Sequence, residues 1–159
     1  MRLILFAVAA LIFMTDQACK SLVRAKIPLG ARVELFPDKL VLTHVRNRGA
    51  ANGLFADNRK ALMFFTAAAV LSEVYTFFDL RKHFRHHKAA WLAFAMNAGG
   101  GASNLLDRVA KKYTVDYLHF CPNKKSLVLN IADLFILTGV LGLIIFYVKQ
   151  LILRDTANG

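Results

Sequence analysis

Apolar residues of this chain are gathered into four long stretches, which polar segments separate. The stretches are Leu3–Met14, extendable to about Val23, and Ala61–Phe78, Ala89–Leu106 and Ile131–Leu153. A helix needs about 20 residues to cross about 30 Å of hydrocarbon. The last stretch has this length, and the first three reach it only by including a few polar residues. The pattern predicts an all-α membrane protein with four transmembrane helices, at approximately 3–23, 61–78, 89–107 and 131–153.

The polar segments between these spans contain short runs with the alternation typical of strands. In "RVELFPDKLVLTHVR", apolar residues alternate on both sides of Pro37-Asp38, which predicts a hairpin outside the bilayer. In "DYLHFCPNKKSLVLN", β-prone runs flank Pro122-Asn123, which marks a second turn. The chain has no internal repeat and no low-complexity tract. We therefore expect one domain, residues 1–159, that carries a small extramembrane β-sheet or hairpin.

Composition supports a membrane protein and says little about orientation. Hydrophobic residues make up 57% of the chain, more than in an ordinary soluble domain of this size. The net charge is +11, but the basic residues lie mostly outside the spans, so lipid headgroups explain them better than nucleic acid, for which no motif is present. The dense basic segment Arg81–Lys88 favours a cytoplasmic side, whereas the longer opposite loops carry more Lys and Arg. Charge alone leaves the orientation open.

The N-terminal segment "MRLILFAVAALIFMTDQACK" is similar to a cleavable lipoprotein signal. However, Asp16 stands three residues before Cys19, where such signals have a small or aliphatic residue, so we expect a retained helix. The second cysteine, Cys121, falls in a loop, and two cysteines define no disulfide framework. Two unpaired thiols are the favoured interpretation, with a disulfide as the alternative.

The last span opens with two polar residues, Asn130 and Asp133. A carboxylate at the mouth of a span is costly to desolvate, so it usually faces a polar cavity or a partner. A hairpin that turns near Asn123–Lys125 places Asp116 opposite residues 131–133. Two carboxylates at short range share a proton, so one can act as a base on water while the other donates, as in an aspartic protease. Spacing alone favours the simpler alternative of two separate aspartates that cap helices or pair with Lys or Arg.

Further polar residues are expected near the same membrane face. Asn104, Asp107 and Arg108 share one face of a helix. Asp16 and Lys20 have the i, i+4 spacing and order of an intrahelical ion pair, which suggests a mainly structural role.

Small and loop residues have two interpretations each. The glycines Gly99–Gly101 allow close approach either of another helix or of an extended substrate. Asn47 and Gly49 lie in a polar loop, where a turn is the simplest explanation.

Two other features give weaker signals. Glu73, in the second span, fits a proton pathway, but snorkelling toward an interface is the favoured reading. The cluster His83, His86 and His87 lacks an acidic residue at the spacing of a zinc protease, so a solvated basic face is favoured over a metal site. No serine-hydrolase elbow is present.

Five motifs occur in one order along the chain: "DQACK", "NRGAANGLF", "NAGGGASNLLDRV", "VDY" and "NIAD". This ordered set resembles the lipoprotein signal peptidase (signal peptidase II) family. The resemblance implies an aspartic endopeptidase of the bacterial cytoplasmic (inner) membrane, which removes signal peptides from diacylglyceryl-modified prolipoproteins by cleaving before the lipidated cysteine. It also implies cytoplasmic termini, an active site and β-element near the outer leaflet, inhibition by globomycin-type peptides, and no metal or cofactor.

The same resemblance assigns roles to residues. Asp116 and Asp133 match the catalytic pair, and the substrate-binding or dyad-orienting residues are Asn47, Gly49, Asn104, Arg108 and Asn130. Asp16, Lys20 and Asp107 match polar structural positions. Three departures from the family pattern are Asn52-Gly53 in place of Phe-Ser, Ser103 in place of glycine, and Tyr117 in place of phenylalanine. The first bears on how the loop before the second span holds substrate.

A non-catalytic membrane protein remains as the alternative. A small transporter or an assembly factor would use the aspartates for ion or proton contacts. A dyad enzyme needs both Asp116 and Asp133, whereas a transporter whose path Asp133 lines would tolerate loss of Asp116.

Overall fold

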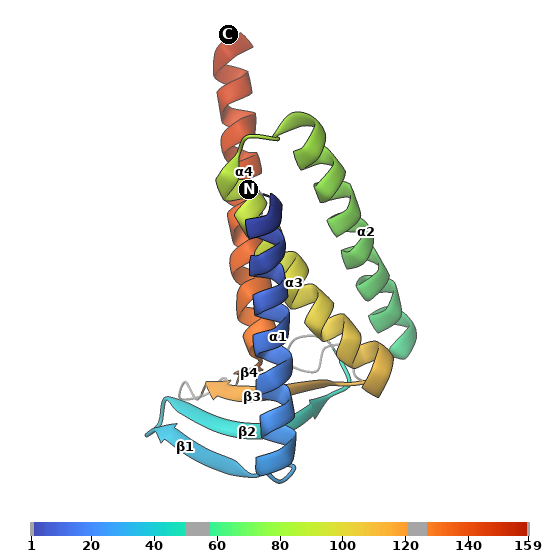
Figure 1. Ribbon diagram of the computed structural model, residues 1–159, viewed down its shortest axis with the longest axis vertical. Helices are drawn as coiled ribbons and strands as arrows, with labels where there is room; N and C mark the ends of the chain where they lie inside the picture. The colour runs from blue at the N-terminus through green and yellow to red at the C-terminus, as the bar shows by residue number, and fades with distance from the viewer. Residues whose placement is uncertain (1, 50–57, 121–126, 159) are drawn as a thin grey trace.

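The computed structural model describes residues 2–49, 58–120 and 127–158. Four helices form a bundle, and a four-stranded sheet lies across one end of it, with both chain termini at the other end (Figure 1). The elements, in chain order, are α1 (Arg2–Lys26), β1 (Arg32–Phe36), β2 (Leu40–Asn47), α2 (Arg59–His83), α3 (Lys88–Lys111), β3 (Thr114–Phe120), β4 (Leu127–Leu129) and α4 (Ile131–Asn158).

Three of the helices are long and apolar enough to cross a membrane. The candidate spans among the described residues are Leu3–Lys26, Lys60–His83 and Ile131–Thr156. The fourth predicted span, 89–107, is not among them, because glycines and polar residues such as Asn104 and Asp107 lower the mean hydropathy of α3. These two side chains are buried, and α3 packs mainly between α1 and α4. The polar residues of α3 therefore face the bundle interior.

Close helix packing depends on glycines that face neighbouring backbones. A Cβ added at Gly99 would lie 2.6 Å from the carbonyl oxygen of Ala9 in α1, and one at Gly100 would lie 2.6 Å from that of Ala132 in α4. At Gly101 an added Cβ would meet nothing within 4 Å. Helix packing thus explains the first two glycines of the run, because small residues at helix interfaces let the backbones approach closely.

The sheet is antiparallel with the order β1-β2-β3-β4. The hairpin predicted around Pro37-Asp38 is confirmed, since β1 pairs with β2 and Asp38 adopts the left-handed backbone (φ 56°) that Asp tolerates in turns. In the second hairpin Leu118 pairs with Leu129, and this register, continued by two residues, sets Asp116 opposite residue 131, as predicted. The turn itself, with Cys121, Pro122-Asn123 and Asn123–Lys125, lies outside the described residues, as does Asn52-Gly53.

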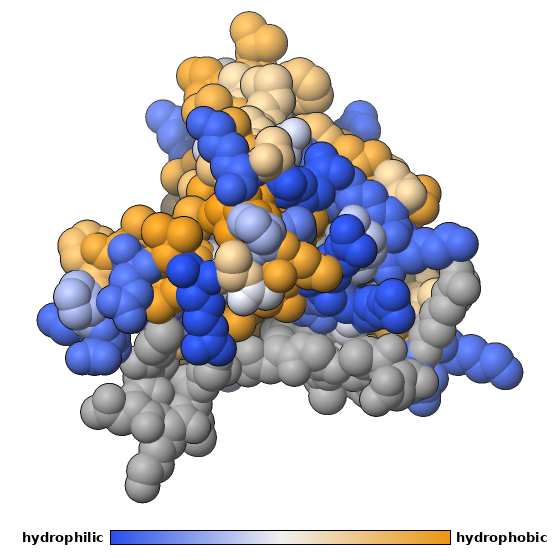
Figure 2. Space-filling model, turned by 90° about the horizontal axis from the view of Figure 1, so that it is seen from below, coloured by the Kyte–Doolittle hydropathy of each residue, from blue (hydrophilic) through white to orange (hydrophobic). Residues whose placement is uncertain are grey.

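The two hairpins are joined into one sheet by a pairing that the sequence pattern did not predict. Strand β2 runs along β3, so that Val45 lies opposite Asp116 and Asn47 opposite Thr114. The last turns of α1 pack on this sheet through a small core in which Val23 contacts Val115 and its neighbours. Seen from this end, the surface carries many hydrophilic residues (Figure 2), in keeping with a position outside the hydrocarbon.

Adjacent glycines offer a matched test of the helix packing. We expect Gly100→Ala to destabilise the protein by about 1–3 kcal/mol, because the added methyl group forces α3 away from the Ala132 carbonyl. Gly101→Ala has open space, and we expect it to stabilise the helix by up to about 1 kcal/mol. Thermal unfolding in detergent micelles measures both. Equal stability of the two variants would contradict the packing described here.

Candidate active site

The two predicted carboxylates meet where the sheet adjoins the bundle, and Asn130 links them. Asp116 lies on β3 and is 2% exposed, and Asp133 lies in the first turn of α4. The Asn130 side chain donates from Nδ2 to Asp116 Oδ1 at 2.8 Å, and its main-chain N–H donates to Asp133 Oδ2 at 3.1 Å. In return, the Asp133 N–H donates to Asn130 Oδ1 at 2.9 Å. This reciprocal capping box begins α4 and fixes both carboxylates around one residue.

Two further asparagines hold the remaining carboxylate oxygens. Asn47 Nδ2 donates to Asp116 Oδ2 at 2.8 Å, and Asn104 Nδ2 donates to Asp133 Oδ1 at 2.8 Å. Together with Asn130, the donors come from β2, from α3 and from the residue before α4, so the site assembles only when the sheet and the helices are docked. Every oxygen of the two carboxylates therefore accepts at least one hydrogen bond from a positioned amide.

The environment of Asp116 favours its protonated form. Burial raises the pKa of this carboxyl, and the nearby charge of Asp133 raises it further, to about 6, although the amides of Asn47 and Asn130 act in the opposite direction. A carboxyl with this pKa exchanges its proton close to neutral pH. Such a shift is common where two acids share a site, and it suits proton transfer.

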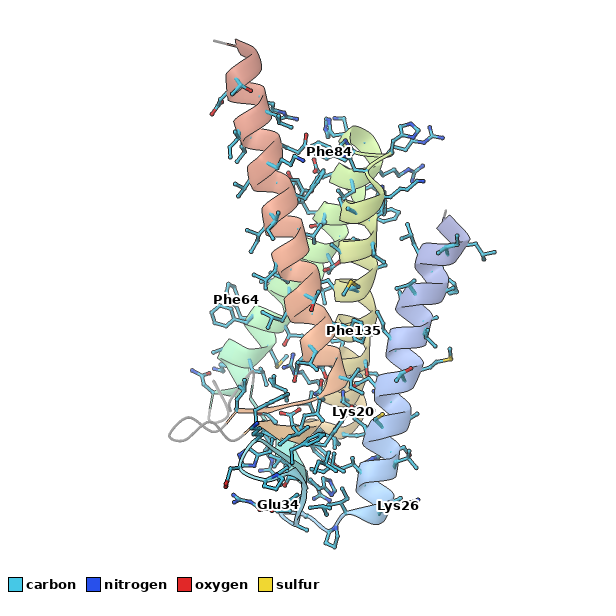
Figure 3. All side chains as sticks on the ribbon, turned by 90° about the vertical axis from the view of Figure 1, so that its left-hand side faces the viewer. Lys20, Lys26, Glu34, Phe64, Phe84 and Phe135 are labelled. Atoms are coloured by element: carbon cyan, nitrogen blue, oxygen red, sulfur yellow. The ribbon has the colours of Figure 1, made fainter. Side chains whose placement is uncertain are left out.

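A buried ion cluster lies directly behind this pair. The predicted intrahelical pair is confirmed, with Lys20 Nζ 2.7 Å from Asp16 Oδ2. Lys20 also lies 3.4 Å from Asp107 Oδ2 and donates to Asn104 Oδ1 at 2.7 Å. In Figure 3 Lys20 is labelled at the level where the helices approach the sheet. Its fully buried ammonium thus orients the asparagine that holds Asp133.

Asp16 of α1 is hydrogen-bonded to α3, β3 and α4. In each case its partner is the sequence neighbour of a residue of the candidate active site. Its carboxylate accepts hydrogen bonds from Ser103 Oγ at 2.6 Å, from Tyr117 OH at 3.3 Å and from the Ala132 N–H at 3.1 Å. Burial and the charge of Asp16 raise the pKa of Tyr117, so its hydroxyl stays a donor. Ser103 and Tyr117 are two of the departures from the family pattern, and both add a hydroxyl to the same buried carboxylate.

Gln17 is a site-supporting residue that sequence reasoning missed. Its Nε2 lies 3.0 Å from the Ser103 carbonyl, 2.9 Å from Ser103 Oγ and 3.2 Å from Asp107 Oδ1. The signal that could have found it is its polarity beside Asp16 within an apolar span.

Asp107 and Arg108 are adjacent in sequence but have separate surroundings. Asp107 pairs with Lys111 at 2.5 Å and accepts the Val115 N–H at 3.3 Å, so it ties α3 to β3. Arg108 Nη2 lies 3.4 Å from the Gly49 carbonyl oxygen. The Gly49 N–H in turn donates to Asn47 Oδ1 at 2.9 Å, which confirms the predicted turn and orients the asparagine that contacts Asp116.

Glu73 and the histidines lie outside this site. Glu73 accepts a hydrogen bond from Asn97 of α3, so the prediction that it snorkels toward an interface is wrong. His83 and His87 pack their rings against Phe84 in the turn between α2 and α3. Within residues 2–49, 58–120 and 127–158, no three His, Cys, Asp or Glu side chains are grouped to hold a metal ion.

Comparison with known proteins decides between the two functional interpretations. The family model described as signal peptidase (SPase) II matches residues 8–149. The chain belongs to the signal peptidase II family. This membership favours a membrane peptidase over the non-catalytic alternative.

Curated relatives of this peptidase match nearly its whole length. The lipoprotein signal peptidase of Symbiobacterium thermophilum is 30% identical, with 97% of this chain and 98% of the relative covered. That of Streptococcus pneumoniae is 29% identical, with 94% and 95% covered. Two solved structures described as bacterial membrane enzymes share the fold, with TM-scores of 0.80 and 0.77 at 24% and 22% identity. The first match covers 97% of this chain and 90% of the solved chain, and the second covers 91% and 92%.

The buried cluster of this peptidase predicts a large difference between two lysines. We expect Lys20→Met to destabilise the fold by about 3–5 kcal/mol, because it leaves Asp16 buried without its cation and removes one of the two cations beside Asp107. Lys111→Met removes a partly exposed partner of Asp107 alone and should cost less. Unfolding by SDS titration in mixed micelles compares them. Equal losses would mean that Lys20 does not organise the cluster.

The pKa of Asp116 predicts a titration that depends on Asp133. We expect the carbonyl stretching band of protonated Asp116, identified by its absence in Asp116→Asn, to disappear as the pH rises through about 6. In Asp133→Asn the neighbouring negative charge is removed, so the midpoint should fall, while burial keeps it above the ordinary value. Infrared difference spectroscopy measures both midpoints. An unchanged midpoint in Asp133→Asn would show that the two groups are not coupled.

Proposed function

We propose that this signal peptidase II family member is an aspartic endopeptidase that removes signal peptides from diacylglyceryl-modified prolipoproteins. Cleavage would occur before the lipidated cysteine, with Asp116 and Asp133 as the catalytic pair. The observation that carries the proposal is the set of hydrogen bonds by which Asn130 holds both carboxylates. The proposed chemistry requires one water and one shared proton, and it uses no metal or cofactor.

The reaction follows from one protonated and one ionised carboxyl. The ionised carboxylate takes a proton from water as the water oxygen attacks the scissile carbonyl carbon, and the protonated carboxyl gives its proton to the carbonyl oxygen. The tetrahedral intermediate then collapses. The carboxyl that took the water proton gives it to the departing amine as the C–N bond breaks, and the other carboxylate takes a hydroxyl proton as the carbonyl re-forms. Because asparagines already hold both carboxyls, little rearrangement is needed to reach the transition state.

The neighbouring polar residues receive supporting roles in this proposal. Asn47, Asn104 and Asn130 orient the dyad through the hydrogen bonds described above. Arg108 would hold the Gly49 turn against the substrate backbone, since its guanidinium reaches the Gly49 carbonyl. The buried cluster of Asp16, Lys20 and Asp107 is structural.

The membrane arrangement is proposed from the shape of the bundle. Helix α3 has 24 residues, about 36 Å of helix, which is long enough to serve as the fourth span beside α1, α2 and α4. We place the sheet and the dyad near the outer leaflet of the bacterial cytoplasmic membrane, with both termini in the cytoplasm. The short basic segment Arg81–Lys88 lies at the end of the bundle that carries the termini, which agrees with this orientation.

The proposed partners follow from the site and its position. Prolipoproteins with a diacylglyceryl group are the substrates, and membrane lipids surround the exposed apolar faces of α1, α2 and α4. Globomycin-type peptides are expected to compete for the dyad. We treat residues 1–159 as one peptidase domain.

A gel-shift assay with a lipidated prolipoprotein tests the catalytic roles. We expect Asp116→Asn and Asp133→Asn each to lower the cleavage rate by at least about 100-fold, because each removes one member of the proton relay. The matched control is Asp155→Asn, an exposed residue near the end of α4, which should cleave like the wild type.

Two results would contradict the proposal. Cleavage that survives in either dyad variant would reject the assigned roles. A folded wild-type protein that does not cleave the lipidated substrate would favour the interpretation as a non-catalytic membrane protein.

A further inference from the structure

A cavity of about 1000 Å³ lies in the half of the bundle remote from the dyad. It is lined by the first half of α1, the end of α2, the turn into α3 and the first half of α3, and it shares no residue with the candidate active site. Its end of the bundle is marked by Phe84 in Figure 3, well separated from Lys20. The walls are apolar and aromatic; they include Phe6, Ala9, Phe77, Trp91, Phe94 and Ala98.

The rim of this cavity is cationic. Arg81, Arg85 and His86 line it from the last turn of α2 and the turn that follows, and all three are exposed. The ion pairs among the described residues all belong to the distant Lys20 and Lys111 cluster, and the cavity lining contains no acidic residue. These cations therefore face the cavity mouth without a carboxylate to neutralise them.

The start of α3 adds to the positive potential at this mouth. The helix begins at Lys88, two residues beyond His86, and its N-cap residue His87 makes no side-chain capping bond. The first N–H groups of a helix lack intrahelical partners and attract anions. An apolar cavity with a cationic rim fits a molecule that has a negatively charged head and a hydrocarbon tail.

Charge complementarity selects among the possible occupants. A signal peptide has a positively charged n-region at this end, which Arg81 and Arg85 would repel. A second copy of this basic chain meets the same repulsion at this rim. An anionic phospholipid has the complementary charge, because arginine forks bind phosphate groups and acyl chains pack on aromatic rings.

We propose that this cavity binds one anionic phospholipid, with its phosphate at Arg81 and Arg85 and an acyl chain between α1 and α3. The lipid would fill the space between α1 and the end of α2. Helix α2 makes its main helix contacts with α3, so this space is not filled by packing of α2 against α1. The site is independent of the proposed peptidase chemistry. Its assignment to the cytoplasmic leaflet and the exclusion of a signal peptide as its occupant rest on the proposed orientation.

Trp91 makes the proposal directly testable, since it lines the cavity and is the single tryptophan of the chain. Full-length protein is reconstituted in phosphatidylcholine vesicles that contain a small, equal fraction of dibrominated phosphatidylglycerol or dibrominated phosphatidylcholine. Bromine quenches tryptophan fluorescence only at short range. We expect about a 10- to 30-fold preference for the anionic lipid, the size expected of two arginines near a lipid surface.

Two double variants distinguish a specific lipid site in the cavity from attraction by the overall surface charge. Arg81→Gln/Arg85→Gln should lose the preference, while Lys82→Gln/Lys88→Gln, which removes the same charge from residues outside the lining, should keep it. Cleavage in the gel-shift assay and thermal unfolding check that both variants are folded. The wild-type comparison needs no variant, so it stands even if one fails to fold.

Three outcomes would overturn the proposal. Equal quenching by the two brominated lipids would mean that the cavity does not select an anionic headgroup. Equal loss of preference in both double variants would indicate diffuse surface charge. Release of quenching by inorganic phosphate at constant ionic strength would indicate a site for free phosphate rather than for lipid.

Discussion

Asn130 makes the hydrogen bonds that hold the sheet, the start of α4 and the two carboxylates in one arrangement. Through its side chain and its main-chain N–H, this residue joins a carboxylate on the sheet to a carboxylate on α4. It also caps the helix that carries Asp133, so the same contacts that begin α4 set the geometry of the dyad. A carboxylate at the mouth of an apolar helix is therefore part of a folded polar site.

The buried cluster behind the dyad explains why polar residues lie so deep in this bundle. Asp16 receives donors from residues adjacent to Asn104, Asp116 and Asp133, so one carboxylate fixes three elements at once. Lys20 compensates its charge and also binds Asn104. The buried charge of Asp16 is tolerated because every partner is in place. The stability of the fold therefore depends strongly on each of these partners.

Local patterns were enough to predict the helices, the first hairpin and the register that sets Asp116 opposite the start of α4. Apolar length, alternation around Pro37-Asp38 and turn chemistry are properties of neighbouring residues. The pairing of β2 with β3, which brings Asn47 to Asp116, is a contact between distant segments and leaves no local signal. The same is true of the contacts from Lys20 to Asn104 and Asp107 of α3, whereas its partner Asp16, one turn away on α1, was visible in the sequence.

Helix α3 and the residues Ser103 and Tyr117 are further cases in which long-range contacts are not visible in the local sequence. The span predicted for 89–107 rests on a helix whose polar residues turn inward, so average hydropathy understates how well it fits the bundle. Ser103 and Tyr117 looked like isolated departures from a family pattern, and only the fold reveals that both donate to Asp16. The catalytic roles themselves rest on chemistry that the sequence suggested and the geometry supports.

A structure of the protein in lipid, at a resolution that locates water, would show whether Asp116 and Asp133 share one water molecule. We expect one ordered water bonded to both carboxyls, with the nearest oxygens of Asp116 and Asp133 no more than about 5.5 Å apart, the span of two hydrogen bonds. Carboxyls held farther apart, each with its own cation and no shared water, would contradict it.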